Sequence, residues 1–377
     1  MPRARLLVVT PSLGGGGAER HLLRILPSLR AAFDVHLATL RSGGALEAEL
    51  DADLPVHRIE SLHWAMAAWR LRRVLGRIQP SAALGFQEAA NIPLLTAVRL
   101  LARSGRPSVA VSTQSAPSVV LADAKRTTRW RVSTAMRRLY PLADCLVVAS
   151  EGVTADLAAV APAAAGRIRL IYNAGVDAAV TSRAAEPWTH PFLAHRAPLL
   201  VACGRLTEQK DYPTLLRAVA DLRHRRDVRL IVLGDGPLRG ALDRLARDLG
   251  IDAIVDLAGY APNPFPCMAR AAAYVLSSRS EGFGNVLVEA LALGVPIVST
   301  DCPYGPGEIL ARGRYGVLVP PGDPAALAYA IDRLLADPDR AGSLAAAGPE
   351  RAAAFTAEQS GAAYVAMLTD LLARRRG

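Results

Sequence analysis

Short apolar runs alternate with stretches of helical periodicity along the whole chain, and this pattern constrains the fold most strongly. In the first half the runs are RLLVVT, DVHLATL, PVHRI, AALGF, SVAVST and CLVVAS. In the second half they are PLLVACG, VRLIVLG, IVDLAG, AYVLSS, PIVST and GVLVP. Strands that alternate with helices form βα units, which assemble into parallel sheets covered by helices. The sequence therefore predicts an α/β protein built from doubly wound, Rossmann-like domains.

The chain has 377 residues, more than one hydrophobic core usually supports. Residues 178–197 are rich in Pro and follow neither period, which is typical of a linker. We expect an N-terminal domain over 1–177, a C-terminal domain over 198–355, and a final helix over 356–377 that packs back on the N-terminal domain. Doubly wound sheets bind ligands at the carboxyl ends of their strands, so we expect the two domains to face each other across a cleft.

The composition indicates a globular protein, with 51% hydrophobic and 21% charged residues and no low-complexity segment. The leading run LLVVT is too short for a signal peptide, and no run approaches the ~20 apolar residues of a transmembrane helix. We therefore expect a cytoplasmic protein. The four cysteines, Cys145, Cys203, Cys267 and Cys302, are scattered without a C-x-x-C pair, which indicates reduced thiols and neither metal nor redox chemistry.

Most of the positive charge lies in the first half of the chain. Residues 1–177 contain 22 Lys and Arg against 13 Asp and Glu, whereas residues 178–377 contain 22 against 21. Two basic segments, Trp69–Arg77 and Lys125–Tyr140, alternate arginines with large apolar residues at helical spacing. Such segments suit an anionic membrane surface, although solvated helix faces remain the alternative; nucleic acid is disfavoured because no recognition motif is present.

This charge pattern predicts peripheral binding to the cytoplasmic face of the inner membrane. The arginines expected to make that contact are Arg70, Arg72, Arg73, Arg129, Arg131, Arg137 and Arg138.

Glycines cluster where predicted strands end. Gly14–Gly17 separate the first strand from a helix, where backbone N–H groups can approach a phosphate. Neither this loop nor GDGPLRG, Gly234–Gly240, has the G-x-G-x-x-G spacing of dinucleotide-binding proteins. Asp256 lies at a distance suited to a ribose contact, so an NAD-linked enzyme stays as an alternative.

Two cations, Arg205 and Lys210, follow the first strand of the second half. The chain contains 42 Arg and only 2 Lys, so a lysine in this turn is unusual for the composition. A planar guanidinium beside a compact ammonium is suited to hold a diphosphate. Ordinary surface charge is the alternative.

Two acids, Glu281 and Glu289, flank a glycine turn and the start of a predicted helix. Eight residues of helix separate them by ~12 Å, whereas carboxylates that cooperate on one glycosidic bond lie ~5–9.5 Å apart. They fit better at the two ends of a long ligand with anionic charge in its middle, which lies over the helix N-terminus. A nucleoside diphosphate sugar has this shape.

Five segments, GGGAER, GRLTEQKDYPTLL, GDGPLRGAL, SEGFGNVLVEALALGVPIVSTD and CPYGPGEIL, resemble in order those of the retaining glycosyltransferases of family 4, which have the GT-B fold. The resemblance spans nearly the whole chain. It implies that Glu281 contacts the transferred sugar, that Arg205 and Lys210 neutralise the diphosphate, and that Glu289 binds the ribose. The remaining donor-binding residues that it implies are Gly16, Gly17, Gly234, Gly236, Tyr260, Gly282, Phe283, Gly284 and Asn285.

The resemblance also implies a reaction. We expect transfer of a hexose or N-acetylhexosamine, from UDP rather than GDP, to a glycan or lipid-linked acceptor in cell-surface polysaccharide or glycolipid synthesis. No cofactor is expected, and no metal, because two cations and a helix N-terminus already face the diphosphate. Asp51 and Asp53 match the D-x-D pattern of metal-dependent transferases but stand in a predicted turn. The leaving phosphate is favoured over a nucleophilic Glu281 as the means of retention.

One departure from the family concerns the acceptor side. Family members often carry a histidine after the fifth strand, where this chain has Ser112, Thr113, Gln114 and Ser115. Ser112 and Gln114 are therefore the acceptor-side candidates, and Gln114 is suited to position a hydroxyl rather than to remove its proton. A sugar-nucleotide epimerase, a phosphorylase and a catalytically silent scaffold share the predicted architecture and stay as alternatives.

Overall fold

The computed structural model describes residues 3–61, 63–122 and 125–375. The chain forms two compact units, one comprising Met1–Ala174 with Ala357–Gly377 and the other Gly175–Thr356. Residues 1–2, 62, 123–124 and 376–377, which the expected domain ranges include, lie outside the described residues.

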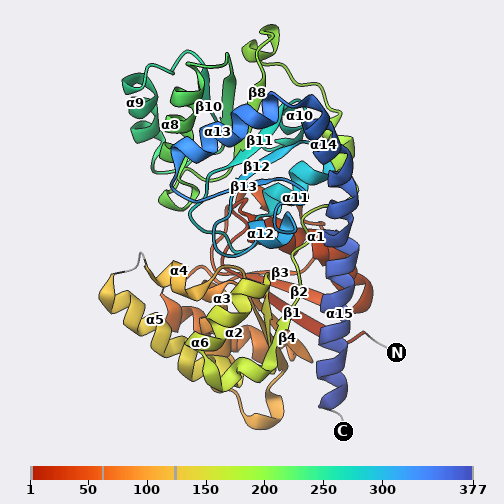
Figure 1. The fold of residues 1–377 in the computed structure, drawn as a ribbon. Coiled ribbons are helices and arrows are strands. Elements are labelled where there is room, and N and C mark those ends of the chain that lie inside the picture. The colour runs from red at the N-terminus through yellow and green to blue at the C-terminus, as the bar shows by residue number, and fades with distance from the viewer. Residues whose placement is uncertain (1–2, 62, 123–124, 376–377) are drawn as a thin grey trace. The chain divides into compact units, whose positions relative to one another are not determined.

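The first unit is built on a parallel sheet with the order β3-β2-β1-β4-β5-β6-β7 (Figure 1). Its strands are β1 (Arg5–Thr10), β2 (Asp34–Thr39), β3 (Val56–Arg58), β4 (Ala82–Phe86), β5 (Ser108–Thr113), β6 (Cys145–Val148) and β7 (Ile168–Leu170). The central strands β1, β4 and β5 are buried on both faces, which is why their sequences are continuously apolar rather than alternating.

Helices cover both faces of this sheet. They are α1 (Gly17–Ala32), α2 (Trp64–Ile78), α3 (Glu88–Arg99), α4 (Pro117–Ala122), α5 (Arg126–Leu139), α6 (Glu151–Val160) and α15 (Ala357–Arg374). The chain adds β2 and β3 on one side of β1 and then crosses back to add β4 to β7 on the other side. Because such crossovers are right-handed, α1 lies on one face of the sheet and α2 and α3 lie on the other.

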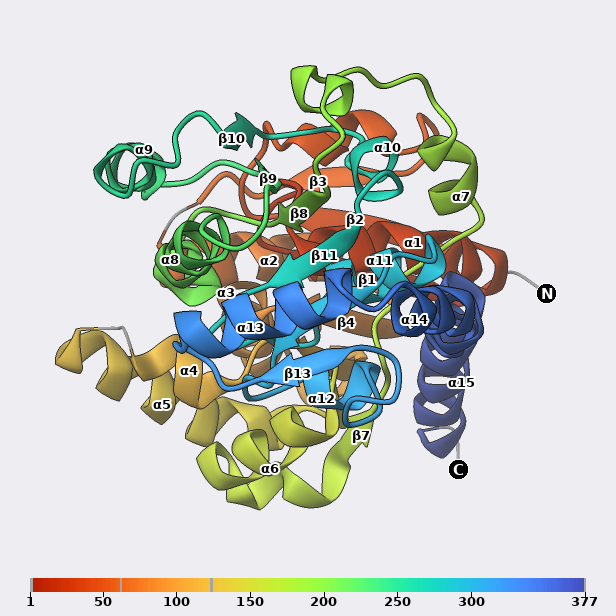
Figure 2. The ribbon, with the colours of Figure 1, turned by 45° about the horizontal axis from the view of Figure 1, so that its top comes forward.

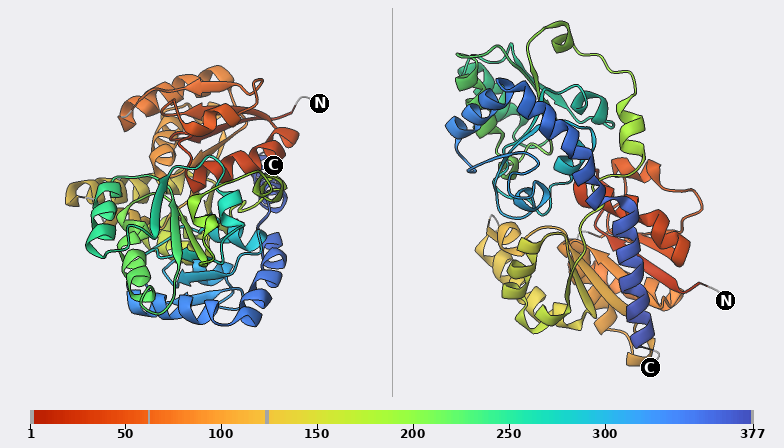
Figure 3. Two further views of the ribbon diagram at one scale, coloured as in Figure 1. Left: turned by 90° about the horizontal axis from the view of Figure 1, so that it is seen from above. Right: turned by 45° about the vertical axis from the view of Figure 1, so that its right-hand side comes forward.

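The C-terminal helix α15 packs along α1, as Figure 1 and the right-hand view of Figure 3 show. Tyr364, Met367 and Leu368 of α15 are buried in one cluster with Leu22 and Ile25 of α1. Burying a side chain of this size stabilises a fold by about 1.5–3 kcal/mol. The last helix is therefore part of the hydrophobic core of the first unit.

The second unit has a parallel sheet with the order β10-β9-β8-β11-β12-β13. Its strands are β8 (Leu199–Cys203), β9 (Arg229–Leu233), β10 (Val255–Gly259), β11 (Ala273–Leu276), β12 (Ile297–Thr300) and β13 (Val317–Val319). Its helices are α7 (Ala179–Ala184), α8 (Tyr212–Leu222), α9 (Arg239–Asp248), α10 (Phe265–Met268), α11 (Asn285–Ala292), α12 (Pro306–Ile309), α13 (Pro324–Leu335) and α14 (Pro338–Ala352). Helix α13 is in contact with β12 and β13, and Figure 2 shows it beside β13.

Two local features differ from the sequence-based expectations. Strand β7 was not predicted, because three partly exposed residues carry no periodic signal. The expected linker over 178–197 belongs to the second unit and contains α7 rather than irregular chain alone. Arg183 donates to the carbonyl of Pro262, and His190 Nε2 lies 2.9 Å from Asp256 Oδ2, so this segment is bound to its unit.

Each sheet has one point at which its strand order reverses. In the first unit this point lies between β1 and β4, and in the second between β8 and β11. Loops that leave two such neighbouring strands diverge to opposite faces, which opens a ligand site at the carboxyl edge of the sheet. The loops after β1, β4, β8 and β11 are therefore the candidate positions of ligand-binding and catalytic residues.

Candidate active site

The loops after β8 and β11 are joined by hydrogen bonds at the reversal point of the second sheet. Gln209 Nε2 donates to the carbonyl of Ser280 (2.8 Å), and Ser277 Oγ donates to the carbonyl of Lys210 (2.8 Å). Arg279 forms an ion pair with Asp211, with Nε and Oδ2 3.0 Å apart. These contacts hold the two loops in one arrangement, as a preorganised site requires.

At the centre of this arrangement Lys210 and Glu281 form an ion pair. Lys210 Nζ donates to Glu281 Oε1 at 2.6 Å, and the two side chains are 16% and 8% exposed. Ser278 Oγ donates to the same carboxylate oxygen at 2.6 Å. We predicted a role for each of these charged residues, Glu281 at the sugar and Lys210 at the diphosphate, but not their contact.

Two ionisable groups near this ion pair, the Cys302 thiol and the Tyr212 hydroxyl, are neutral. Burial, together with the nearby Glu281 carboxylate, raises the pKa of the Cys302 thiol to about 12 and that of the Tyr212 hydroxyl well above its usual value. Tyr212 donates to the carbonyl of Gly204 at 3.1 Å. Neither Cys302 nor Tyr212 therefore changes its charge beside the ion pair near neutral pH.

Arg205 lies in the loop after β8 with its side chain exposed to solvent. Gly234 and Gly236 lie in the turn that follows β9, and both pack against this loop. Gly234 has φ +148°, and a Cβ there would collide with the backbone of Gly204; a Cβ at Gly236 would collide with the backbone of Leu206. These two glycines therefore fix the path of the loop that carries Arg205. The predicted donor residue Tyr260 follows β10 directly, and its side chain is 46% exposed.

The remaining predicted donor residues lie at the start of α11. Gly284 has φ +103° and precedes the first turn of the helix, a conformation that favours glycine. Phe283 is buried and stacks edge-on with Phe355 at 5.4 Å between centroids, so only the main chain of this turn can face a ligand. Asn285 and Glu289 are buried on the helix, which sets Glu289 apart from an exposed helix acid.

In the first unit, the loop after β1 leads directly into α1. Gly15 has φ +99°, Gly16 precedes the helix and Gly17 begins it. Their N–H groups thus lie at the amino end of a helix, where an anion is stabilised. The predicted acceptor-side residues Ser112 and Gln114 lie at the end of β5 and just after it, and both are buried.

Glu88, the first residue of α3, lies directly after β4 and was missed by sequence reasoning. Its Oε1 is buried and has no hydrogen-bond partner among the described residues, and burial raises its pKa from 4.5 to about 7. The Thr113 side chain opposes this rise in the pKa of Glu88, and the Glu88 carboxylate in turn raises the pKa of Tyr140. No sequence signal distinguishes this acid from other first-turn acids, because only the tertiary packing buries it.

The raised pKa of Glu88 predicts a pH-dependent stability. Between pH 4.5 and about 7 the folded state keeps a proton that the unfolded state has lost, so this group makes the protein less stable as the pH rises through that window. Above it the ionised group costs about 3 kcal/mol, at ~1.4 kcal/mol per pH unit. Glu88→Gln should therefore raise the melting temperature clearly at pH 8 and much less at pH 4.5. Equal shifts at both pH values would contradict the assignment.

The other acids considered in the sequence, Asp51, Asp53 and Asp256, each contact a side chain of the protein. Asp51 and Asp53 both form ion pairs with the Arg30 guanidinium, which is consistent with the turn-acid interpretation of the D-x-D match. Asp256 forms a hydrogen bond with His190. Within the described ranges, no group of three or more His, Cys, Asp or Glu side chains is arranged to hold a metal ion.

The two basic segments form α2 and α5. Some of their arginines bind backbone carbonyls: Arg70 those of Ile59 and Glu60, Arg72 that of Leu100, and Arg129 that of Leu121. Large apolar side chains stand exposed among them, namely Trp64, Met66 and Trp69 on α2 and Trp130, which is 70% exposed, on α5. The Arg73 guanidinium lies 4.2 Å from the centroid of the Trp69 ring. No helix in the described part of the chain is long and apolar enough to cross a bilayer.

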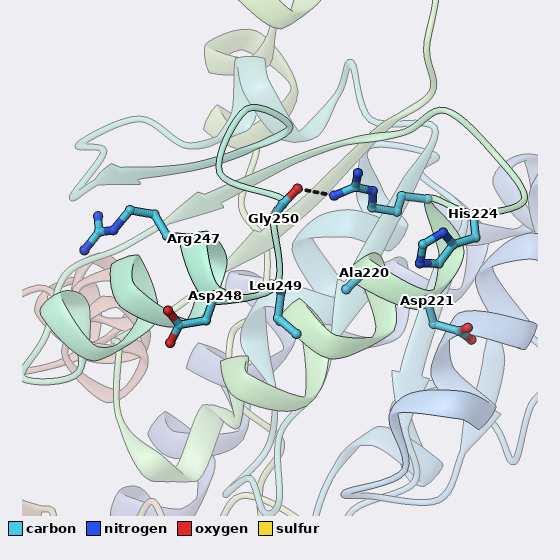
Figure 4. A pocket seen from close by; sticks show the side chains of 8 residues that line it. Ala220, Asp221, His224, Arg247, Asp248, Leu249 and Gly250 are labelled. Atoms are coloured by element: carbon cyan, nitrogen blue, oxygen red, sulfur yellow. Dashed lines mark hydrogen bonds between the residues drawn. The ribbon is translucent and has the colours of Figure 1, made fainter.

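A surface hollow at the ends of α8 and α9 does not coincide with these residues (Figure 4). It is lined by Asp221, His224, Arg247 and Asp248 among others, and the Arg223 guanidinium crosses it to the carbonyl of Gly250. Helices in βα units run antiparallel to the strands, so the carboxyl ends of these helices lie near the amino edge of the sheet. The hollow is therefore on the opposite edge from the Lys210–Glu281 pair.

Two family models match the chain in succession. One, described as Glycosyltransferase Family 4, matches residues 15–179, and the other, described as Glycosyl transferases group 1, matches residues 197–337. The chain belongs to glycosyltransferase family 4. This confirms the family that the five sequence segments indicate.

This family 4 glycosyltransferase is similar in sequence to curated enzymes and in fold to solved structures. It is 27% identical over 323 residues to N-acetylgalactosamine-N,N'-diacetylbacillosaminyl-diphospho-undecaprenol 4-alpha-N-acetylgalactosaminyltransferase of Campylobacter jejuni, a match that covers 82% of this chain and 84% of that protein. Its fold is similar to that of Anabaena HepE, solved with UDP and glucose, with a TM-score of 0.83, 19% identity and coverage of 98% and 100%. The lipopolysaccharide biosynthesis enzyme WaaG gives a TM-score of 0.76 at 15% identity, with coverage of 97% and 99%. The fold is therefore GT-B, as predicted.

Proposed function

We propose that this glycosyltransferase moves a hexose or N-acetylhexosamine from a nucleoside diphosphate sugar to a hydroxyl of a glycan or lipid-linked acceptor, with retention of configuration. The observation that carries the proposal is the buried Lys210–Glu281 ion pair at the reversal point of the second sheet. A sugar hydroxyl can bind the carboxylate while the ammonium faces the diphosphate, so one pair serves both parts of the donor.

The transfer breaks the bond between the sugar's anomeric carbon and the diphosphate, and negative charge grows on the leaving oxygen. Lys210, Arg205 and the first N–H groups of α11 stabilise that charge. The acceptor oxygen forms the new bond to the anomeric carbon on the face that the diphosphate leaves, and its proton passes to the leaving phosphate. Glu281 binds the sugar in this scheme and forms no covalent bond.

UDP is the proposed nucleotide, with Glu289 as the ligand of the ribose hydroxyls. Support comes from the GT-B neighbour solved with UDP and glucose. Support also comes from the burial of Glu289 on α11, eight residues after Glu281.

For the acceptor we propose a lipid-linked or cell-surface glycan, reached at the cytoplasmic face of a membrane. One relative acts on a diphospho-undecaprenol substrate and one structural neighbour serves lipopolysaccharide biosynthesis, which supports this class of acceptor. Exposed tryptophans among the arginines of α2 and α5 support peripheral binding, because Trp favours the membrane–water interface.

A panel of UDP- and GDP-sugars, incubated with the protein with and without a membrane lipid extract, tests the proposal. Nucleotide release that depends on one donor and increases with the extract is the expected result. Conversion of one nucleotide sugar into another would indicate an epimerase, and turnover dependent on free phosphate would indicate a phosphorylase. No binding of any donor would indicate a scaffold.

The same reaction should not depend on a divalent metal. Arg205, Lys210 and the start of α11 supply the positive charge that a metal supplies in other transferases, and Asp51 and Asp53 are paired with Arg30. Turnover in excess EDTA should therefore equal turnover without it. Loss of turnover in EDTA, restored by Mg²⁺ or Mn²⁺, would contradict metal independence. Asp51 and Asp53 would then be the first candidates for metal ligands.

A further inference from the structure

A chain of buried side chains in the first unit connects the C-terminal helix to the loop after β5. It runs from His21 on α1 through Tyr364 on α15 to Ser112 on β5 and ends at Gln114. The first three side chains are completely buried and Gln114 is 7% exposed. Residues from three separate elements thus meet at the carboxyl edge of the sheet.

The direction of the chain follows from His21. Its Nδ1 accepts a hydrogen bond from the backbone N–H of Ala174 at 2.9 Å, so the ring proton sits on Nε2. Burial, with Arg24 nearby, lowers the pKa of His21 to about 3, so the ring is neutral. Nε2–H therefore donates to Tyr364 Oη, 3.5 Å away, and this leaves the tyrosine O–H to donate onward.

Ser112 receives hydrogen bonds from both sides. Tyr364 Oη lies 3.0 Å from Ser112 Oγ, and Gln114 Nε2 donates to the same oxygen at 2.7 Å. The Gln114 amide is thereby fixed at its nitrogen, and its carbonyl Oε1 remains buried without a hydrogen-bond partner among the described residues. A buried acceptor that is left unsatisfied destabilises the folded state.

An unsatisfied oxygen at this place is better explained by a ligand than by packing. The acceptor atoms Tyr364 Oη and Ser112 Oγ both receive hydrogen bonds within the chain, whereas Gln114 Oε1, at its end next to β5, has no donor among the described residues. Carboxyl ends of the strands are where this class of sheet binds its ligands. An amide oxygen is a hydrogen-bond acceptor only, so the missing group must be a donor, such as a hydroxyl.

We propose that Tyr364 and Ser112 are positioning residues that hold the Gln114 amide so that its oxygen accepts a hydrogen bond from a hydroxyl of the sugar acceptor. This inference rests on the proposed function and makes the C-terminal helix part of the acceptor site. Tyr364 acts only through Ser112 and Gln114 and does not touch the acceptor.

The test measures the KM for the acceptor and the KM for the donor in the transfer reaction, for Tyr364→Phe, Gln114→Ala and the double variant. Each single variant should raise the KM for the acceptor about tenfold, the equivalent of one lost hydrogen bond, and should change the KM for the donor much less. Because Tyr364 acts through Gln114, the double variant should be no worse than Gln114→Ala alone. Tyr329→Phe, at an exposed tyrosine of α13, is the matched control.

Additive effects in the double variant, or an unchanged acceptor KM in Tyr364→Phe, would overturn the inference. Ser112→Ala gives the same test if Tyr364→Phe folds poorly, and melting temperatures identify that case. If the wild type transfers sugar but these variants behave like the control, this inference alone fails. If the wild type transfers no sugar at all, the proposed function fails and the inference with it.

Discussion

Glu281→Gln should lower sugar transfer about a hundredfold or more, the typical cost of removing one preorganised electrostatic contact. The substitution keeps the shape of the side chain and removes its charge, so the hydrogen bond from Ser278 can persist. Lys210 then lies in a mostly buried position without its carboxylate partner. Lys210→Met and Arg205→Ala should cause losses of similar size, because each removes positive charge from the leaving diphosphate. Steady-state transfer rates measure all three.

The control for this prediction is an ion pair in the same unit that lies away from the candidate site. Arg226 Nε and Asp332 Oδ1 are 3.0 Å apart, and both side chains are partly exposed. Asp332→Asn should leave transfer unchanged, since exposed pairs contribute about 0–1 kcal/mol. Folded Glu281, Lys210 and Arg205 variants with wild-type rates would show that the catalytic site lies elsewhere.

Replacing Arg131, Arg137 and Arg138 of α5 with Gln should weaken binding to anionic vesicles about a hundredfold, because each basic residue near such a surface contributes ~1 kcal/mol. All three side chains are exposed. Arg70, Arg72 and Arg129, by contrast, bind backbone carbonyls. Donor hydrolysis should persist. Binding of the wild type should also decline as salt rises, since salt screens exposed charges.

Vesicles of neutral and anionic lipid, sedimented with protein at low salt, provide the measurement. The matched control neutralises Arg244, Arg247 and Arg340, which are exposed arginines of the second unit. Equal binding by wild type, variant and control, or no binding by the wild type, would leave α2 and α5 as solvated helix faces and favour a soluble acceptor.

The sequence predicted the fold well because its dominant signal is local. Every apolar run that it identified as a strand forms one, since strands of a parallel sheet are buried on both faces and read as continuous apolar runs. Strand β7 escaped because Ile168–Leu170 is too short to show a pattern. Helix α7 escaped because its six residues lie in a Pro-rich stretch.

Side-chain contacts were predicted less well, because they depend on distant segments. The contact between Lys210 and Glu281 joins loops 71 residues apart in sequence. The buried state of Glu88 and the link from Tyr364 to Ser112, 252 residues apart, also arise only from tertiary packing. Motif positions such as Gly284 were predictable for the opposite reason, since a left-handed backbone at a helix start selects glycine locally.

The anomeric configuration of the product shows whether this enzyme transfers sugar with retention. The protein is incubated with the UDP-α-sugar that the donor panel identifies, labelled at the anomeric carbon, together with its acceptor, and the product is examined by NMR. We expect an α-linked product formed in equal amount with free UDP. A β-linked product, or UDP released with free sugar and no glycoside, would contradict retaining transfer by the Lys210–Glu281 site.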